Sequence, residues 1–336
     1  MYDSRDAFLN EIIAHPSEDA PRLVFADWLE EHGDPRGEFI RVQCQLAGIE
    51  PDDPLFDELS DRESSLLTQL GDQWREDVPE WARPGCEFRR GFVERVAVWR
   101  HENFSKLHQL RHCTPLQTLS LHDVAGTMKE FVASGVLEWI RGVEVLDSVA
   151  GFHEMRDLLS LPDDDQDGAP EPVFIQRLSM LGLTLSDAAA IVLKYRVNLP
   201  NLVSLELVRC DFGSHGAQFL AETERLPRLI SLDLSENEIG DAGVWHLASA
   251  AARSTLRQLH LRETSLTDEA IQHLADAVFT DNLRTLDVSG NRLTDASAAI
   301  LAKRMPNLKW LTARNCYFTP RGLLQLQERF GKRMRV

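Results

Sequence analysis

A unit of 27 residues recurs along most of this 336-residue chain. Each copy opens with an L-x-x-L-x-L pattern or a degenerate form of it. The starts fall at Leu116, Val143, Ile175, Leu202, Leu229, Leu256, Leu283 and Leu308. From Ile175 onward the steps are 27, 27, 27, 27 and 25 residues. A fixed period of this length indicates stacked supersecondary units, none of which can bury its apolar side alone.

Each unit combines the apolar spacing of a strand with that of a helix. The inward positions of the copy that starts at Leu229 are Leu229, Leu232, Leu234, Ile239, Val244 and Leu247. The first three alternate as in a strand and the last two follow helical spacing. Strands stack about 4.8 Å apart whereas helices need about 8 to 10 Å, so the array must curve. The sequence predicts an α/β solenoid with parallel strands on its concave face and helices on its convex face.

These units resemble leucine-rich repeats of the longer, ribonuclease-inhibitor type. The resemblance implies a horseshoe of about eight to nine repeats over residues 86–336. Val93, Val96 and Val98 occupy the first apolar positions ahead of Leu116, which predicts the first strand of the array there.

Residues 1–85 are predicted to form a separate, all-α and acidic module. Apolar stripes indicate helices around residues 8–13, 21–31, 36–47 and 55–70, and Gly33 suits a left-handed helix stop. The stretch from Arg22 to Arg41 resembles the repeat-companion domain that precedes leucine-rich repeats in certain bacterial proteins. The resemblance covers about residues 4–48 and implies a cap for the open end of the solenoid, since terminal repeats need one. Residues 73–90 are expected to be a linker.

Charge and composition exclude several classes of function. The net charge is −17, and residues 1–85 hold 21 acidic side chains against 7 arginines and no lysine. Binding to nucleic acid or to an anionic membrane needs clustered cations, so neither is expected. The one basic cluster is Arg329, Lys332, Arg333 and Arg335. No apolar run is long enough to span a bilayer and no signal peptide is evident, so a cytoplasmic location is expected. The five cysteines lack the spacing of a disulfide framework or a zinc site.

Two recurring polar columns are expected to serve the backbone. The first is Cys210, Asn237, Thr264, Asn291 and Cys316, eight residues after each repeat start. The resemblance implies that these side chains satisfy backbone groups in the turn that leaves the strand, which gives the thiols no reactive role. The second is Asp187, Asp241, Asp268 and Asp295, mostly preceded by Ser, Gly or Thr. A hydroxyl residue before the aspartate, as at Thr267 and Thr294, is expected to be the N-cap, with the carboxylate in the first helical turn near its free N–H groups. Such capping explains these aspartates better than catalysis does.

The outward positions of the strands remain as candidates for function. Glu206, Asp233, His260 and Asp287 are predicted to lie in a row, strand by strand. Gln258 and Trp310 belong to a neighbouring row, in which Trp310 is a candidate aromatic anchor. Arg262 and Arg314 are expected to form a flanking positive edge. This pattern favours a protein partner with a basic segment over a merely solvated face.

The period breaks once, between Leu161 and Val173. The insert contains Asp163, Asp165, Asp167 and Glu171, spaced like the opening of a calcium loop. Its twelfth position is Phe174, where calcium requires a bidentate Glu. The insert is therefore interpreted as an acidic bulge with a weak candidate calcium site, and no cofactor is expected.

The leading hypothesis is a non-enzymatic interaction scaffold that binds a protein through its concave face. The alternative is a GTPase-activating regulator of a small GTPase, because the repeats also resemble those of the Ran GTPase-activating proteins. The two obvious candidates for such a role, Asn237 and Asn291, are already assigned to turns. No nucleophile, phosphate loop or metal-ligand cluster indicates a hydrolase.

Overall fold

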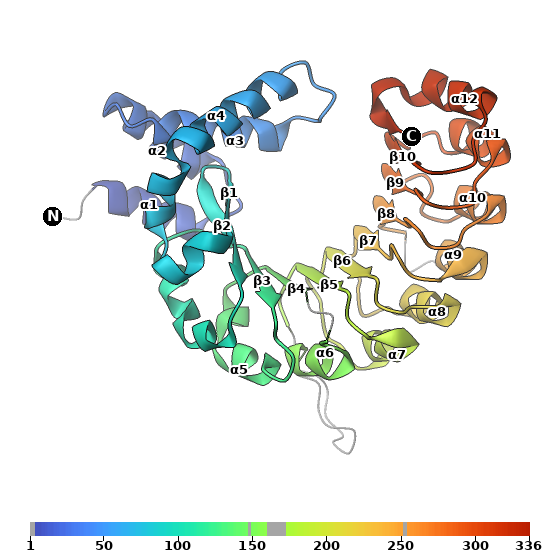
Figure 1. The fold of residues 1–336 in the computed structure, drawn as a ribbon, viewed down its shortest axis with the longest axis horizontal. Helices are drawn as coiled ribbons and strands as arrows, with labels where there is room; N and C mark the ends of the chain where they lie inside the picture. The colour runs from blue at the N-terminus through green and yellow to red at the C-terminus, as the bar shows by residue number, and fades with distance from the viewer. Residues whose placement is uncertain (1–3, 147–148, 160–172, 251–253) are drawn as a thin grey trace. The chain divides into compact units, whose positions relative to one another are not determined.

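A computed structural model describes residues 4–146, 149–159, 173–250 and 254–336 of the chain (Figure 1). The chain divides into two compact units. Unit 1 comprises residues 1–122 and 133–140, and unit 2 comprises residues 123–132 and 141–336. No helix in the described ranges has both the length and the apolar character that crossing a membrane requires.

Unit 1 begins with four helices. They are α1 (Ser4–Ala14), α2 (Ala20–Glu31), α3 (Arg36–Gly48) and α4 (Phe56–Trp74). All four confirm the helices that the apolar stripes predict. Gly33 has a φ of +73°, the left-handed conformation expected of a residue that stops a helix. Phe25, Ala26, Leu29 and Ile40 form the buried core of this region, and Trp28 packs against it from a half-buried position.

The remainder of unit 1 is a short sheet with 3-10 turns. Its elements are η1 (Arg75–Asp77), η2 (Glu80–Gly85), β1 (Cys86–Arg89), β2 (Phe92–Val98), η3 (His101–His112), β3 (Thr118–His122) and η4 (Val136–Glu138). Strands β1 and β2 are antiparallel, and β3 is parallel to β2. Val93, Val96 and Val98 are buried, as predicted for the first strand of the array.

The expected linker over residues 73–90 is wrong at its C-terminal end, because residues 86–89 form strand β1. Arg90 and Gly91 have φ values of +48° and +88°, which two-residue hairpin turns of type I′ require. A Cβ atom on Gly91 would lie 2.3 Å from the Ile40 side chain. Glycine is therefore needed both for the turn and for its close approach to α3.

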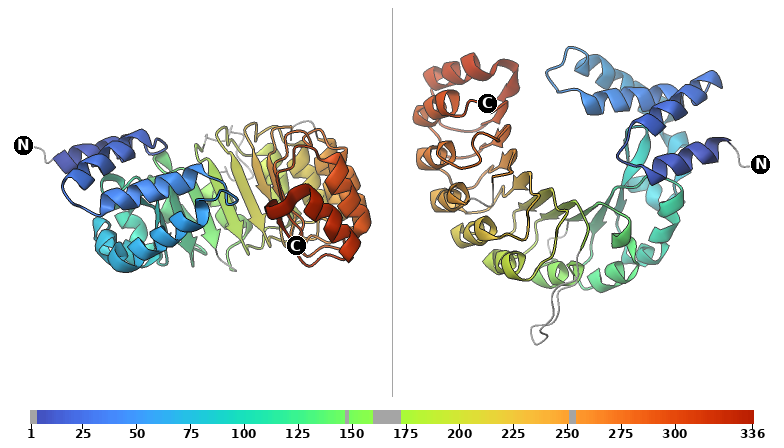
Figure 2. Two further views of the ribbon diagram at one scale, coloured as in Figure 1. Left: turned by 90° about the horizontal axis from the view of Figure 1, so that it is seen from above. Right: turned by 180° about the vertical axis from the view of Figure 1, so that it is seen from behind.

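Unit 2 repeats a strand and a helix, and α5 (Met128–Ala133) begins in it. Its further elements are β4 (Gly142–Leu146), α6 (Phe152–Leu158), β5 (Arg177–Leu181), α7 (Ser186–Tyr195), β6 (Ser204–Val208), α8 (Ser214–Glu222), β7 (Ser231–Asp233), α9 (Gly240–Ser249), β8 (Gln258–His260), α10 (Asp268–Ala275), β9 (Thr285–Asp287), α11 (Asp295–Arg304), β10 (Trp310–Thr312), α12 (Pro320–Phe330), η6 (Gly331–Arg333) and β11 (Met334–Arg335). Strands β4 to β11 pair in chain order, each parallel to the next. Within unit 2 the strands line the inner side of an arc and the helices its outer side (Figures 1 and 2). This confirms the predicted α/β solenoid.

The repeat leucines form the core of unit 2. The starts Ile175, Leu202, Leu229, Leu256, Leu283 and Leu308 are at most 1% exposed. A column of fully buried apolar residues thus runs from one repeat to the next, as the period predicts.

The repeat start assigned to Val143 is wrong by three residues. In the pairing of β4 with β5, Val143 lies opposite Leu178 and Val145 opposite Met180. Val143 is therefore the fourth position of its repeat, which starts at Ile140. Since side chains alternate along a strand, an odd shift exchanges the two faces. Val145 is accordingly buried, whereas a repeat that started at Val143 would point Val145 outward.

Candidate functional site

The predicted row of charged side chains forms in unit 2. The register places Glu206 opposite Asp233, Asp233 opposite His260, and His260 opposite Asp287. All four side chains are half-buried on the strand side of the arc. Within the described chain, the side chains of Glu206 and His260 make no hydrogen bond or ion pair. We call these four residues the charged row.

A second row runs beside it. Gln258 lies opposite Thr285, and Thr285 lies opposite Trp310. Gln258 is exposed and Trp310 is half-buried. Because positions two apart on a strand share a face, both rows lie on one surface.

The charged row extends further than the sequence indicates. Thr312 follows Asp287, and the short strand β11 places Arg335 opposite Thr312. The sequence identifies Arg335 only as part of a basic tail, since a strand of two residues leaves no period to recognise. The row therefore has carboxylates at one end and a guanidinium at the other.

Asp233 and Asp287 also stabilise the turns that follow their strands. Asp233 accepts a hydrogen bond from the Ser235 backbone at 2.8 Å, and Asp287 accepts one from Ser289 at 2.9 Å. Each serine hydroxyl in turn accepts a bond from the backbone of the next repeat, at Arg262 and at Arg314. The two aspartates are thus held in fixed positions by the backbone that they support.

Buried asparagines hold consecutive repeats together below this surface. Asn237 accepts bonds from the backbone N–H groups of Cys210 and Phe212 at 2.9 and 3.0 Å. Its amide donates to the carbonyls of Leu207, Leu234 and Ser235 at 2.6 to 3.1 Å. Asn291 repeats this pattern two repeats further on. The predicted turn role is confirmed, and both amides are only 2% exposed.

The recurring aspartates also bond the following repeat, a contact that N-capping does not predict. Asp241 accepts bonds from the backbone and the hydroxyl of Thr267, at 2.8 and 2.6 Å. Asp268 and Asp295 bond Thr294 and Thr319 in the same way. The threonines are the N-caps, as predicted for Thr267 and Thr294. Each aspartate therefore supports the cap of the following repeat rather than its own helix, which only the stacking of repeats could reveal.

Comparison with protein families identifies the repeating unit. Residues 198–221, 227–247 and 282–302 match the family described as Leucine Rich repeat. These segments are leucine-rich repeats. Curated proteins give no match. Unit 2 is thus a leucine-rich repeat solenoid, in agreement with its alternating strands and helices.

Solved structures similar to the chain share little sequence with it. A protein from Bacteroides fragilis is 14% identical with a TM-score of 0.51, over 83% of both chains. A chain of the Rad7 and Elc1 complex in yeast is 15% identical with a TM-score of 0.46, over 96% of both chains. A chain of the TLR13–ssRNA13 complex is 17% identical with a TM-score of 0.41, over 70% of this chain and 35% of that one. The likeness to the B. fragilis protein supports the fold alone.

The predicted positive edge beside the leucine-rich repeat strands is partly neutralised. Arg262 pairs with Glu236 and, at 3.5 Å, with Glu263. The side chain of Arg314 is exposed. The positive charge of Arg262 is therefore balanced by two glutamates. Arg314 is the more accessible of the two cations.

The cysteines of the repeats have no activated thiol. Burial raises the pKa of Cys210 to about 12, and Cys210 donates to the Met180 carbonyl at 3.2 Å. Burial also raises the pKa of Cys316. Since the thiolate is the nucleophile, both residues are suited to a structural role.

The candidate calcium residues Asp163, Asp165, Asp167 and Glu171 lie outside the described residues. Within the described ranges, no group of three or more His, Cys, Asp and Glu side chains is arranged to hold a metal ion.

Proposed function

We propose that this chain is a non-catalytic interaction scaffold that binds a protein segment on the strand face of unit 2. The observation that carries the proposal is the register that aligns Glu206, Asp233, His260 and Asp287 on adjacent strands. Two of these carboxylates are fixed by bonds to the backbone, so a ligand need not order them on binding.

The chemistry of this face favours a partner segment with Lys or Arg side chains. Three carboxylates in four adjacent positions attract cations that reach across the strands. Trp310 offers an aromatic surface in the neighbouring row, and Gln258 offers a neutral donor and acceptor. Arg314 and Arg335 lie toward the C-terminal end and favour the opposite charge there. A bound segment would therefore run with its basic side chains toward β6 and its neutral or acidic ones toward β10.

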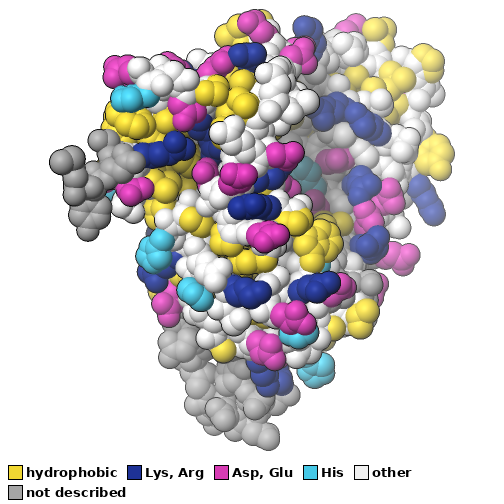
Figure 3. All heavy atoms as spheres, turned by 60° about the vertical axis from the view of Figure 1, so that its left-hand side comes forward, with side chains coloured by type: hydrophobic (Ala, Val, Ile, Leu, Met, Phe, Trp, Pro, Cys, Tyr) yellow, Lys and Arg dark blue, Asp and Glu magenta, His cyan; other side chains and the backbone are white. Residues whose placement is uncertain are grey.

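A protein partner is favoured over nucleic acid by the distribution of charge. The net charge of −17 opposes a polyanion. Figure 3 shows acidic, basic and apolar side chains interspersed on the face that it presents, over the residues that it colours. Electrostatic attraction of a basic segment to the carboxylates weakens as the salt concentration rises. The salt dependence of binding therefore distinguishes this interaction from purely apolar docking.

We further propose that the repeats are of the ribonuclease-inhibitor type over residues 86–336, and that residues 1–85 form a repeat-companion module that caps them. Support comes from contacts inside unit 1. The Arg36 side chain donates to the Gly91 carbonyl at 2.9 Å, and Gln43 accepts from the Gly91 backbone at 2.6 Å. Both bonds join helix α3 to the hairpin at the first strand.

The test is selection of peptides from a random library on the intact chain. Wild type is expected to enrich peptides with Lys or Arg at alternate positions. The triple variant Glu206→Gln, Asp233→Asn and Asp287→Asn keeps the hydrogen-bond acceptors and removes three charges, so the enrichment should disappear. Calorimetry on one selected peptide should show a loss of affinity of at least about tenfold, as expected when several charge-assisted contacts are lost.

The matched control removes three carboxylates elsewhere in unit 2. Glu224→Gln, Glu238→Gln and Asp281→Asn change the net charge equally and alter exposed side chains away from the charged row. This variant should retain the selected peptides. Equal loss of binding in both variants would mean that net charge alone drives capture, and would overturn the proposal.

A further inference from the structure

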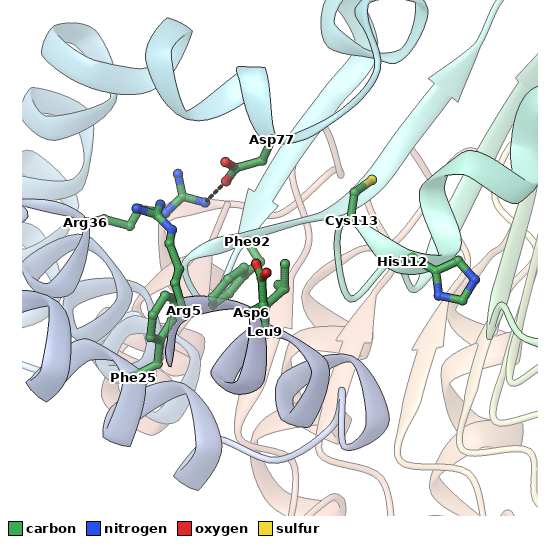
Figure 4. A pocket seen from close by; sticks show the side chains of 9 residues that line it. All are labelled: Arg5, Asp6, Leu9, Phe25, Arg36, Asp77, Phe92, His112 and Cys113. Carbon is green, nitrogen blue, oxygen red and sulfur yellow. Dashed lines mark hydrogen bonds and ion pairs between the residues drawn. The ribbon is translucent and has the colours of Figure 1, made fainter. Parts of the chain in front are cut away.

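Unit 1 contains a cavity of about 310 Å³ that the repeat pattern does not account for. Its apolar wall is Leu9, Phe25 and Phe92, and its polar lining is Arg5, Asp6, Arg36, Asp77, His112 and Cys113 (Figure 4). The rings of Phe25 and Phe92 are stacked with centroids 6.2 Å apart. An apolar wall combined with a few charged groups is typical of small-molecule sites, which have volumes of about 300 to 1,000 Å³.

The chemically distinctive group in the cavity is Arg36, which is only 3% exposed. Its Nε atom donates to the Gly91 carbonyl at 2.9 Å and its Nη2 atom to Asp77 at 3.2 Å. These bonds leave further N–H groups of the guanidinium available to a ligand. The ring centroids of Phe92 and Trp74 lie 5.6 and 5.0 Å from the guanidinium carbon, so the guanidinium makes cation–π contacts with both rings.

A second guanidinium stands beside it. The Arg5 and Arg36 side chains approach one another in Figure 4, and burial together with the nearby Arg5 lowers the pKa of Arg36 to about 10 against the opposing effect of Asp77. Arg36 thus stays charged at neutral pH. Arg5 itself lies 3.5 Å from Asp34 and is about half exposed. Two like charges held together at the edge of an apolar cavity create a place where an anion is stabilised.

The other charges of the lining favour a ligand with one negative charge over a ligand with two. Asp77 and Asp6 are carboxylates, so the cavity has no excess of positive charge over its acidic groups. A phosphate dianion would meet more repulsion from these two aspartates than a carboxylate would. A planar carboxylate also matches the fork of N–H groups on a guanidinium.

We propose that this cavity binds a monocarboxylate with an apolar or aromatic body, its carboxylate on Arg36 and Arg5 and its body against Leu9, Phe25 and Phe92. Such a group occurs in free organic acids and at the C-terminal residue of a peptide chain. The inference concerns unit 1 and is independent of the partner surface proposed for unit 2.

The test uses the full chain and four probes in calorimetry and saturation-transfer NMR. The probes are 3-phenylpropionate, its neutral isostere 3-phenylpropionamide, N-acetylglycylphenylalanine and inorganic phosphate. At least one carboxylate should bind, the amide should bind at least about tenfold more weakly, and phosphate should not compete. Binding of the phenylpropionate alone identifies a free acid, and binding of the acetylated dipeptide alone identifies a chain terminus.

Two variants with opposite expected effects separate binding from folding. Arg5→Gln removes a half-exposed cation and should weaken the carboxylate about tenfold. Asp77→Asn removes the anion that competes for Arg36 and should tighten it several-fold. Arg41→Gln is the control, because Arg41 pairs with Asp27 and Glu30 outside the cavity. Equal affinity for the amide and the acid, displacement by phosphate, or an unchanged affinity in Arg5→Gln would each overturn the proposal.

Discussion

The two units solve the same problem, the burial of polar groups, in different ways. In unit 2, short neutral or acidic side chains bond the backbone of the neighbouring repeat, and the same bonds recur along the array, as at Asn237 and Asn291. In unit 1, individual charged side chains join segments far apart in sequence. Arg22 is 0% exposed and contacts Glu94 at 2.7 Å across 72 residues. Unit 2 therefore distributes its polar bonds over many repeats, whereas unit 1 concentrates them in a few residues.

The pKa shifts of Arg22 and Glu94 both indicate that the cost of burying these charges exceeds their mutual attraction. Burial lowers the pKa of Arg22 despite the opposing effect of Glu94, and burial raises the pKa of Glu94 despite the opposing effects of Arg22 and Arg90. The Nε atom of Arg22 also makes no hydrogen bond. We expect a pair of this kind to favour a unique arrangement more than it lowers the free energy of folding.

The largest effect is expected from removing one member of this pair. Arg22→Met leaves Glu94 buried with Arg90 as its remaining partner. The free energy of unfolding should fall by about 3 to 5 kcal/mol. Urea denaturation followed by circular dichroism measures it. The double variant Arg22→Met with Glu94→Gln should recover most of the loss, because no buried charge is left unpaired. Failure to recover would show that Arg22 acts mainly through its packing on Phe92 and its bonds to the Pro16 and Arg90 carbonyls.

The corresponding change in unit 2 should be smaller and more local. Asn237→Ala leaves buried N–H and C=O groups of two adjacent turns without partners, so we expect a loss of about 2 to 4 kcal/mol. Hydrogen exchange followed by mass spectrometry should show increased exchange in the repeats that contain Cys210 and Asn237, since repeats contact mainly their neighbours. Asn201→Ala is the control, because Asn201 makes a surface bond to Arg228. Uniform exchange across the chain would contradict the local character of the array.

The junction between one repeat and the next helix offers a milder test. Thr267→Ala removes the N-cap of α10 and the hydroxyl that donates to Asp241. A loss of about 1 kcal/mol is expected, as for other N-cap threonines. Thr267→Ser retains the hydroxyl and should stay close to wild type in the same urea assay. If both substitutions cost equally, the methyl group rather than the hydrogen bond matters.

The two units should also respond to pH with opposite signs. Burial raises the pKa of Glu94 in the folded state, so its contribution is fully present below its unfolded value of about 4.5 and is lost as the pH rises through the raised value. Burial alone would raise the pKa of Asp268, but bonds from Ser297 and Thr294 hold it below its usual range. The contribution of Asp268 is therefore present above about 3.8 and lost as the pH falls through the lowered value. Urea midpoints between pH 2.5 and 7 for Glu94→Gln and Asp268→Asn should diverge from wild type in opposite directions.

The smallest effect is expected on the strand face. Glu206→Gln changes a half-buried side chain with no bond inside the described chain, so stability should change by less than about 0.5 kcal/mol. Asp233→Asn should cost little more, since the amide oxygen still accepts from Ser235. Thermal unfolding scans compare both with wild type. A large loss in Glu206→Gln would show that this residue is structural and would weaken its place in a binding surface.

Much of unit 2 was predictable because its period repeats. The leucine columns and the alignment of Glu206 through Asp287 follow from counting residues, and the resemblance to leucine-rich repeats implies the asparagine turns. The structure agrees with each. The phase of the copy near Val143 was not predictable in this way. Its worn pattern allows a start at Ile140 or at Val143, and only pairing of Val143 with Leu178 in β5 selects the first.

Other features have no signal in a single sequence. The hydrophobic pattern does not show that Arg22 lies inside the protein, because arginine in an amphipathic helix is normally exposed. Its burial depends on Glu94 and on the Pro16 carbonyl, which only the folded chain brings together. The short strand β11 is defined solely by its pairing with β10.

The sequence by itself determined the repeating architecture, since a fixed period of apolar residues can be buried only by stacking one unit on the next. It also determined which polar residues recur at fixed positions of the repeat. The tertiary structure alone decided the start of the repeat near Val143, the partners of the recurring aspartates Asp241, Asp268 and Asp295, the buried arginines of unit 1 and the cavity beside Arg36. Each of these features depends on contacts between residues that are far apart in the sequence. The interaction energies of such contacts arise only when folding brings the distant segments together.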